Sequence, residues 1–138
     1  MLADHGDASD VPVLLAALRR AVEAEFWCEA EKPACGLGRL RAADAVDDLT
    51  VAWESTLHSY ARAAFLEGLQ GCAGDRADAY TAEALDDCEP SVQELACTTA
   101  PDGASLRSRI GELAEDPLTP EVHEAARARL AVLRGDRA

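Results

Sequence analysis

The sequence predicts an all-α fold, an α-α superhelix of about four stacked helical hairpins. Ala and Leu, the strongest apolar helix formers, dominate the apolar residues, which make up 49% of the chain while aromatic residues make up 4%. β-branched residues never alternate over a strand-length run. Similar stretches recur at an interval of about 30 to 33 residues, a repeat length typical of helical solenoids.

The chain of 138 residues is long enough for one domain with its own core. We expect a flexible N-terminus over residues 1–10, a single repeat domain over 11–133 and a C-terminal tail over 134–138. The polar start MLADHGDASD does not resemble a signal peptide. No apolar run approaches the about 20 residues of a membrane span.

The first predicted hairpin contains an apolar stripe at helical spacing, formed by Val11, Leu14, Leu15, Leu18 and Val22. Its second helix is expected to begin at Trp27. Pro33 falls inside that helix and is expected to kink or split it. The glycine-rich stretch GLGRLRAAD has a turn composition and is expected to join the first hairpin to the second.

The second hairpin is predicted within AVDDLTVAWESTLHSYARAAFLEGL, residues 45–69, with Trp53 and Tyr60 at core positions. GCAGDRAD and APDGAS are expected turns between later hairpins, and Asp75 and Thr119 are expected helix caps.

The third and fourth hairpins share a second pattern, in ALDDCEPSVQELA and LAEDPLTPEVHEAA. In each, a proline precedes a valine by two residues, which suits the first turn of a helix. The acids Asp86, Asp87 and Glu89 come directly before such a helix start. Helix N-termini favour negative charge, so these acids are interpreted as elbow residues between two helices. We therefore predict no metal site there.

The formal charge of −13 disfavours nucleic-acid binding, because phosphates would be repelled on average. A basic protein partner or simple solubility fits this charge better, and a solvated acidic surface is the favoured interpretation of the acids. The single lysine beside many arginines is typical of a GC-rich bacterial genome. The five cysteines have no C-x-x-C spacing, and we interpret them as buried, reduced thiols of a cytoplasmic protein.

Over about residues 11–133, the motifs resemble the short HEAT-like repeat of the kind also found in phycobilin lyases. AVDDLTVAWESTLHSYARAAFLEGL and EALDDCEPSVQELA resemble it best, GELAEDPLTPEVHEAARARLAVL is close, and EFWCEAEKPACGLGRL resembles a degenerate second helix. The resemblance implies a stacked-hairpin fold and, in most such proteins, a scaffold or binding module. The family's arginine after the valine is replaced by Gln93 and His123.

An enzyme is the alternative function, as an accessory lyase or modification enzyme of the HEAT-like type. One HEAT-like hydroxylase family binds di-iron through several His-Glu dyads, whereas this chain has only His123-Glu124. Cys35, one helical turn after Lys32, is the candidate reactive thiol, with a buried thiol favoured. We expect no cofactor and no catalytic residue.

We therefore predict a non-catalytic protein–protein interaction scaffold. The outward side chains of the second helix of each hairpin, on the concave face of the solenoid, would contact the partner. Phe26 and Trp27 are adjacent, and the apolar face of one helix does not fully bury two adjacent residues. One of the two rings is therefore a candidate exposed anchor for a partner. The alternative is that both rings belong to the core. The candidate partner-binding residues are Glu25, Phe26, Trp27, Glu29, Arg62, Gln93, His123 and Arg127. The oligomeric state and the identity of the partner stay open.

Overall fold

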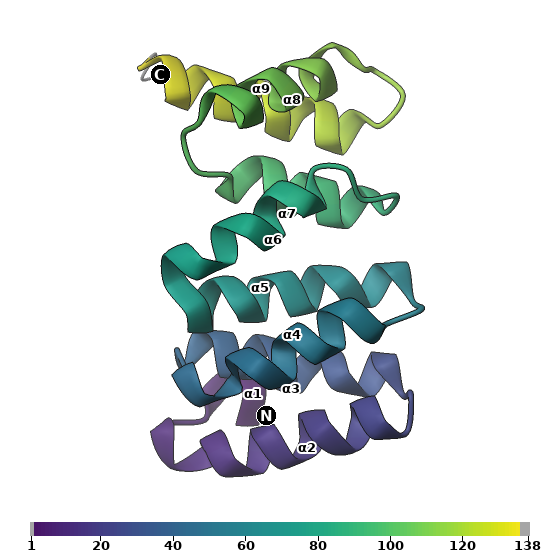
Figure 1. The fold of residues 1–138 in the computed structure, drawn as a ribbon, viewed down its shortest axis with the longest axis vertical. Helices are drawn as coiled ribbons and strands as arrows, with labels where there is room; N and C mark the ends of the chain where they lie inside the picture. Colours follow the sequence, from purple (N-terminus) through teal and green to yellow (C-terminus); the bar gives the residue numbers. More distant parts are fainter. Residues whose placement is uncertain (1, 136–138) are drawn as a thin grey trace. The chain divides into compact units, whose positions relative to one another are not determined.

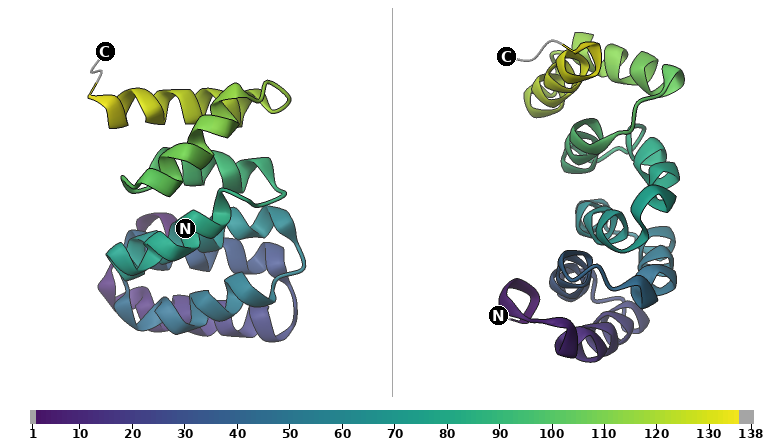
Figure 2. Two further views of the ribbon diagram at one scale, coloured as in Figure 1. Left: turned by 45° about the horizontal axis from the view of Figure 1, so that its top comes forward. Right: turned by 90° about the vertical axis from the view of Figure 1, so that its left-hand side faces the viewer.

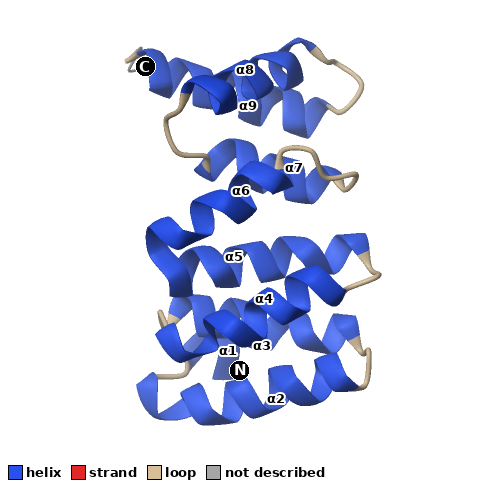
Figure 3. Ribbon diagram, viewed as in Figure 1, coloured by secondary structure: helices blue, strands red, loops and turns tan. Residues whose placement is uncertain are grey.

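The computed structural model describes residues 2–135 and consists of helices joined by short loops (Figure 3). Helix accounts for 81% of it and no strand occurs between residues 2 and 135, which confirms the all-α class. No helix in this range is long and apolar enough to cross a lipid bilayer. Residues 136–138 of the expected C-terminal tail lie outside the described residues.

Packing divides the chain into two compact units, Met1–Ala77 and Asp78–Ala138, where the sequence predicts one repeat domain over 11–133. We refer to them as unit 1 and unit 2. Each has its own buried apolar residues and its own pair of helical hairpins.

Unit 1 contains α1 (Leu2–His5), α2 (Val11–Glu23), α3 (Trp27–Arg39), α4 (Val46–Ser55) and α5 (Arg62–Ala73) (Figure 1). Short 3₁₀ turns occur at Ala8–Asp10, Ala43–Ala45, Ser59–Ala61 and Gly74–Ala77. α2 pairs with α3, and α4 pairs with α5. Figure 2 shows α2 and α4 in one layer and α3 and α5 in the other.

The core of unit 1 lies between these two layers. Trp27 packs edge-on against Phe65, with ring centroids 6.4 Å apart, so the start of α3 is anchored to the first turn of α5. On the surface, Arg19 of α2 makes two 2.8 Å hydrogen bonds to the carboxylate of Asp48 in α4. The largest fully buried side chains of this unit are Leu18, Leu37, Leu49, Trp53, Phe65, Leu66 and Leu69.

Glycines allow the backbones of α3 and α5 to touch. A Cβ built on Gly38 would lie 2.8 Å from the Cα of Gly68, and one built on Gly68 would lie 2.9 Å from the carbonyl oxygen of Ala34. A Cβ on Gly71 would collide with the carbonyl group of Gly38. No larger residue fits these positions while the helices keep this separation.

The prediction that GLGRLRAAD is wholly a turn was wrong, because Gly36 and Gly38 lie inside α3 and are buried. Here glycine serves close packing, and the turn comes later, after Arg39. Of the two effects expected of Pro33, a kink or a split, the split does not occur, since α3 runs continuously through it. Proline removes one N–H of the helix ladder, and the packed face of α3 holds the remaining turns in place.

The N-terminal segment lies on α3, although the sequence predicts flexibility for residues 1–10. A Cβ on Gly36 would come within 2.8 Å of the Cα of Ala3, so α1 packs directly on α3. The guanidinium of Arg39 donates hydrogen bonds to the carbonyl oxygens of Ala3 and Gly6, at 3.0 and 2.8 Å. These contacts hold α1 at the glycine-rich end of α3.

Unit 2 contains α6 (Asp78–Ala84), α7 (Pro90–Thr99), α8 (Ala104–Glu115) and α9 (Pro120–Arg134). α6 pairs with α7, α8 pairs with α9, and α7 packs beside α9. The prediction that Pro90 and Pro120 open helices is confirmed. Thr119 holds the N-cap position of α9 without a side-chain capping bond. The buried apolar side chains of this unit include Leu85, Val92, Ala96, Cys97, Ile110, Leu113, Val122 and Ala126.

We expect Gly71→Ala to lower the free energy of unfolding of unit 1 by about 3 kcal/mol, because the new methyl group forces α5 away from α3. Both tryptophans lie in unit 1, so urea denaturation followed by tryptophan fluorescence measures this change. Gly111→Ala is the matched control, because a Cβ there meets no atom within 4 Å. It should leave that transition unchanged and raise the stability of unit 2 by about 1 kcal/mol, measured by circular dichroism. Equal destabilisation by both substitutions would contradict the glycine contact.

Candidate functional site

Unit 1 exposes apolar side chains at the elbows between the paired helices. Phe26 is 59% exposed in the α2–α3 elbow, and Leu57 is 86% exposed in the α4–α5 elbow. Both elbows lie at the same edge of unit 1, on the right-hand side of Figure 1. Large apolar side chains grouped on a surface are typical of interaction sites.

The α2–α3 elbow is a Schellman motif that turns Phe26 outward. The N–H of Phe26 donates to the carbonyl of Ala21 at 2.8 Å, and the N–H of Glu25 donates to that of Val22 at 3.1 Å. This motif requires one residue in the left-handed backbone conformation, usually glycine. Here Glu25 adopts that conformation, with a φ of 56°. Trp27 follows and turns inward, where only 5% of it is exposed. Of the two candidate aromatics, Trp27 is therefore core and Phe26 is the exposed ring.

The α4–α5 elbow adds Leu57, His58 and Tyr60 to the same edge. The side-chain oxygen of Thr56 accepts a hydrogen bond from the N–H of His58 at 3.2 Å, which fixes the turn. The rings of His58 and Tyr60 meet edge-on at 5.2 Å. The prediction that Tyr60 is core was wrong: it is 46% exposed, because it belongs to a 3₁₀ turn that precedes α5.

A contact between Cys28 and Tyr60 joins the two elbows. The Cys28 sulfur and the Tyr60 hydroxyl are 3.2 Å apart. This hydrogen bond is the main cause that raises the pKa of Tyr60, with burial and the nearby charge of Glu31 as further causes. The phenol therefore stays neutral at physiological pH. We call the surface formed by Phe26, Cys28, Leu57, His58 and Tyr60 the elbow patch.

The elbow patch has acidic neighbours. Glu25 and Glu29 flank Phe26 and are exposed, and Glu54 is exposed at the end of α4, just before the second elbow. Arg62 does not offset them on the surface, because its guanidinium stacks 3.7 Å above the Trp53 ring and donates to the Trp53 carbonyl oxygen at 2.9 Å. Arg62 is thus an internal support of α4 and α5.

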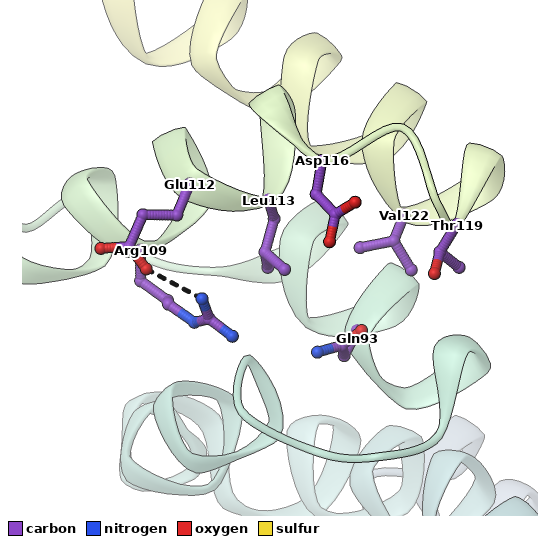
Figure 4. A pocket seen from close by; sticks show the side chains of 7 residues that line it. All are labelled: Gln93, Arg109, Glu112, Leu113, Asp116, Thr119 and Val122. Carbon is purple, nitrogen blue, oxygen red and sulfur yellow. Dashed lines mark hydrogen bonds and ion pairs between the residues drawn. The ribbon is translucent and has the colours of Figure 1, made fainter.

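The other candidate residues lie in unit 2. Gln93 lines a cleft of about 290 Å³ together with residues of α8 and α9 (Figure 4). Its side-chain amide donates to the carbonyl oxygen of Leu85 at 3.3 Å, inside the same hairpin. His123 and Arg127 line a separate groove on α9. Phe26, Glu25 and Glu29 are therefore brought together at one edge, whereas Gln93 is separate from His123 and Arg127.

The charged groups of the cleft form ion pairs and hydrogen bonds within unit 2, although the buried Nε of Arg109 has no hydrogen bond of good geometry in the described range. Arg109 pairs with Asp86 at 2.6 Å and with Glu112 at 2.8 Å. The carboxylate of Asp116 accepts a hydrogen bond from the N–H of Leu118 at 2.9 Å. Polar groups that already have partners give a ligand little to bind, so the cleft holds the α6–α7 elbow to α8.

The elbow acids of unit 2 stabilise the turn itself. Asp86 forms the ion pair with Arg109, and the carboxylate of Asp87 accepts from the N–H of Glu89 at 3.0 Å. Glu89 occupies the N-cap of α7 without a capping hydrogen bond from its side chain. As predicted, the three acids lie in the elbow between α6 and α7, and Asp86 and Asp87 order it through these contacts. No group of three or more His, Cys, Asp or Glu in the described ranges is placed to hold a metal ion.

The expectation that the cysteines are buried was wrong for Cys28 and Cys88, which are exposed near helix starts, and correct for Cys97. Cys35 is half-buried, and its thiol donates to a carboxylate oxygen of Glu67 at 3.6 Å. Burial and then the charge of Glu67 raise the pKa of Cys35 to about 12. This environment keeps the sulfur protonated, which is the opposite of what a thiol nucleophile requires.

Sequence reasoning missed Leu57 and the exposed role of Tyr60. A signal for Leu57 was present: Phe26, Leu57, Cys88 and Leu118 recur at an interval of about 31 residues, within solenoid repeat lengths, and each lies in an elbow. Two residues of this series belong to each unit.

No protein-family model, no curated protein and no solved structure matches this chain. The candidate site therefore depends on the geometry of the described residues.

We expect Glu25→Gly to raise the free energy of unfolding of unit 1 by about 1 kcal/mol, because glycine adopts a positive φ without the steric cost of a Cβ. Glu25→Ala is the control, since it removes the carboxylate and keeps the Cβ, and should change stability by less than about 0.5 kcal/mol. Fluorescence-detected urea denaturation measures both. A glycine variant less stable than the alanine variant would contradict a left-handed Glu25.

We expect a thiol reagent such as Ellman's reagent to react rapidly at pH 8 with Cys28 and Cys88 and slowly with Cys35 and Cys97, whose pKa values burial raises to about 12 and about 11. The double variant Cys28→Ser, Cys88→Ser should lose the fast phase. Fast labelling of Cys35 in that variant, located by mass spectrometry, would show a reactive thiol and favour an enzyme.

Proposed function

We propose that this chain is a non-catalytic protein-recognition module, built from HEAT-like hairpins of a stacked solenoid, that binds a basic partner through the elbow patch of unit 1. The observation that carries the proposal is the grouping of Phe26, Leu57 and Tyr60 on one exposed edge. Exposed apolar side chains grouped on a surface mark interaction sites, and aromatic side chains such as Tyr are enriched among the residues that supply most binding energy.

The geometry of the patch supports recognition because its side chains are held in place. The Schellman motif orients Phe26, and the Cys28–Tyr60 contact joins the two elbows. A partner that binds such a surface loses less entropy than one that must first order it. Near the starts of α3 and α5, the Trp27 ring packs edge-on against Phe65, which supports the spacing of the two elbows.

The charge around the patch supports a basic partner. Glu25, Glu29 and Glu54 are exposed beside it, and the nearby Arg62 is engaged with Trp53. A segment that carries Arg or Lys between apolar residues complements both properties of this surface. The five cysteines are free, which supports the cytoplasm as the location in this proposal.

The alternative function, an accessory lyase or modification enzyme, is less well supported. Its candidate nucleophile Cys35 has a raised pKa and points at a carboxylate. Its candidate dyad residue His123 lies in unit 2, in the groove on α9.

A random peptide library displayed on phage tests the proposal. We expect selection on the wild-type protein to enrich peptides that combine Arg or Lys with apolar residues. For a synthetic copy of an enriched peptide, the double variant Phe26→Ala, Leu57→Ala should weaken binding by about 2 kcal/mol or more, since both side chains lie at the contact. Isothermal titration calorimetry measures the affinity.

Leu118→Ala is the matched control, because Leu118 is 87% exposed in an elbow of unit 2, much as Leu57 is exposed in unit 1. It should leave the affinity unchanged. The proposal fails if selection enriches no peptide, if the enriched peptides are acidic, or if the double variant binds them as tightly as the wild type.

A further inference from the structure

A groove of about 530 Å³ runs along α9 in unit 2, between that helix and the end of α8. Ala114, Leu130 and Ala131 form its apolar walls. Arg127 and Arg134 supply positive charge. His123 and Glu115 complete the lining, so the charge of the groove is positive although the chain as a whole carries −13. We call this surface the α9 groove.

The other arginines of unit 2 for which the structure describes partners are neutralised or held. Arg107 makes hydrogen bonds of 2.6 and 2.7 Å to the two carboxylate oxygens of Asp102. Arg109 pairs with Asp86 and Glu112, and Arg129 donates to the carbonyl oxygen of Ala100. Arg107 and Arg109 are thus neutralised by nearby carboxylates, and Arg129 is held by a backbone carbonyl.

Arg127 and Arg134 differ from these arginines. Neither makes an ion pair or a hydrogen bond with any residue of the range that the structure describes, and both are exposed. The Nδ1 atom of His123 is buried and also has no hydrogen-bond partner within that range. In a chain with twice as many acidic as basic residues, two such arginines on one groove mark a surface with unused capacity to bind carboxylates.

The spacing of these residues matches one side of a helix. Arg127 follows His123 by four residues, and Arg134 follows Arg127 by seven. Leu130 and Ala131 lie between the two arginines. Polar groups able to bind anions therefore alternate with apolar contacts along α9. A ligand that satisfies both must carry negative charges and aliphatic side chains along its length.

We propose that the α9 groove binds an acidic amphipathic segment of a second protein. Its Asp or Glu side chains pair with Arg127 and Arg134, since the planar guanidinium matches a carboxylate in a two-point contact. Its aliphatic side chains cover Leu130 and Ala131. Nucleic acid is a poorer occupant, because the rest of this acidic surface repels a phosphate backbone. This site is separate from the elbow patch and prefers the opposite charge.

Two synthetic amphipathic peptides of about 15 residues, long enough for about four helical turns, test the inference. They share the same Leu and Ala positions, and one carries Glu where the other carries Lys. We expect fluorescence anisotropy to show binding of the Glu peptide by the wild-type protein. The double variant Arg127→Glu, Arg134→Glu should lose about tenfold or more in affinity for it.

The matched control is Arg20→Glu, Arg76→Glu, which makes the same change in net charge on exposed arginines of unit 1. It should lower the affinity by about twofold or less, since neither arginine lines the α9 groove and charges outside a site are screened by salt. The neutral variant Arg127→Gln, Arg134→Gln should lose several-fold, and circular dichroism establishes that each variant is folded. Phe26→Ala, Leu57→Ala should leave Glu-peptide binding unchanged, so failure of the elbow patch and failure of the α9 groove are distinguishable.

Three results would overturn the inference. The wild-type protein does not bind the Glu peptide; the two double charge-reversal variants lose affinity equally; or a single-stranded oligonucleotide binds the wild type more tightly than the Glu peptide does and loses affinity in Arg127→Glu, Arg134→Glu. The last result would assign the groove to phosphate groups.

Discussion

The backbone contact between α3 and α5 is the constraint on which the rest of unit 1 depends. Gly38, Gly68 and Gly71 replace side chains at the crossing, so the two helices approach until backbone atoms meet. Each glycine inside a helix costs about 1 kcal/mol relative to alanine, and dispersion and burial at the contact must offset that cost. At the other end of the two helices, the Trp27–Phe65 and Cys28–Tyr60 contacts hold the starts of α3 and α5 together, where the elbow patch lies.

Much of the fold could be predicted because proline and apolar periodicity report on local geometry. Pro90 and Pro120 open α7 and α9, as expected from a residue that suits the first helical turn. The glycines of GLGRLRAAD could not be interpreted correctly in the same way. Glycine is favoured both in turns and at close helix crossings, and only the position of α5 decides between them.

The site was harder to predict than the fold, because exposure depends on neighbours distant in sequence. Phe26 and Trp27 are adjacent, and only the Schellman turn at Glu25 decides which ring points outward. Arg62 was a reasonable candidate for an exposed partner-binding residue, yet its guanidinium stacks on the Trp53 ring. Tyr60 was expected at a core position, but it lies in a 3₁₀ turn that precedes α5, and this turn leaves it exposed.

The distribution of charge gives the strongest reason to assign binding to this chain. An acidic protein gains stability and solubility when its arginines pair with nearby carboxylates, as Arg19, Arg107 and Arg109 do. Arginines without such partners in the described part of the chain lie beside an apolar groove on α9, and Glu25 and Glu29 lie beside the exposed ring of Phe26 together with Arg20. A partner of opposite charge supplies the missing pairs and covers the apolar surface at the same time. The two proposed sites differ in charge preference, and each has its own apolar contact area, so together they would suit an adaptor between an acidic and a basic protein.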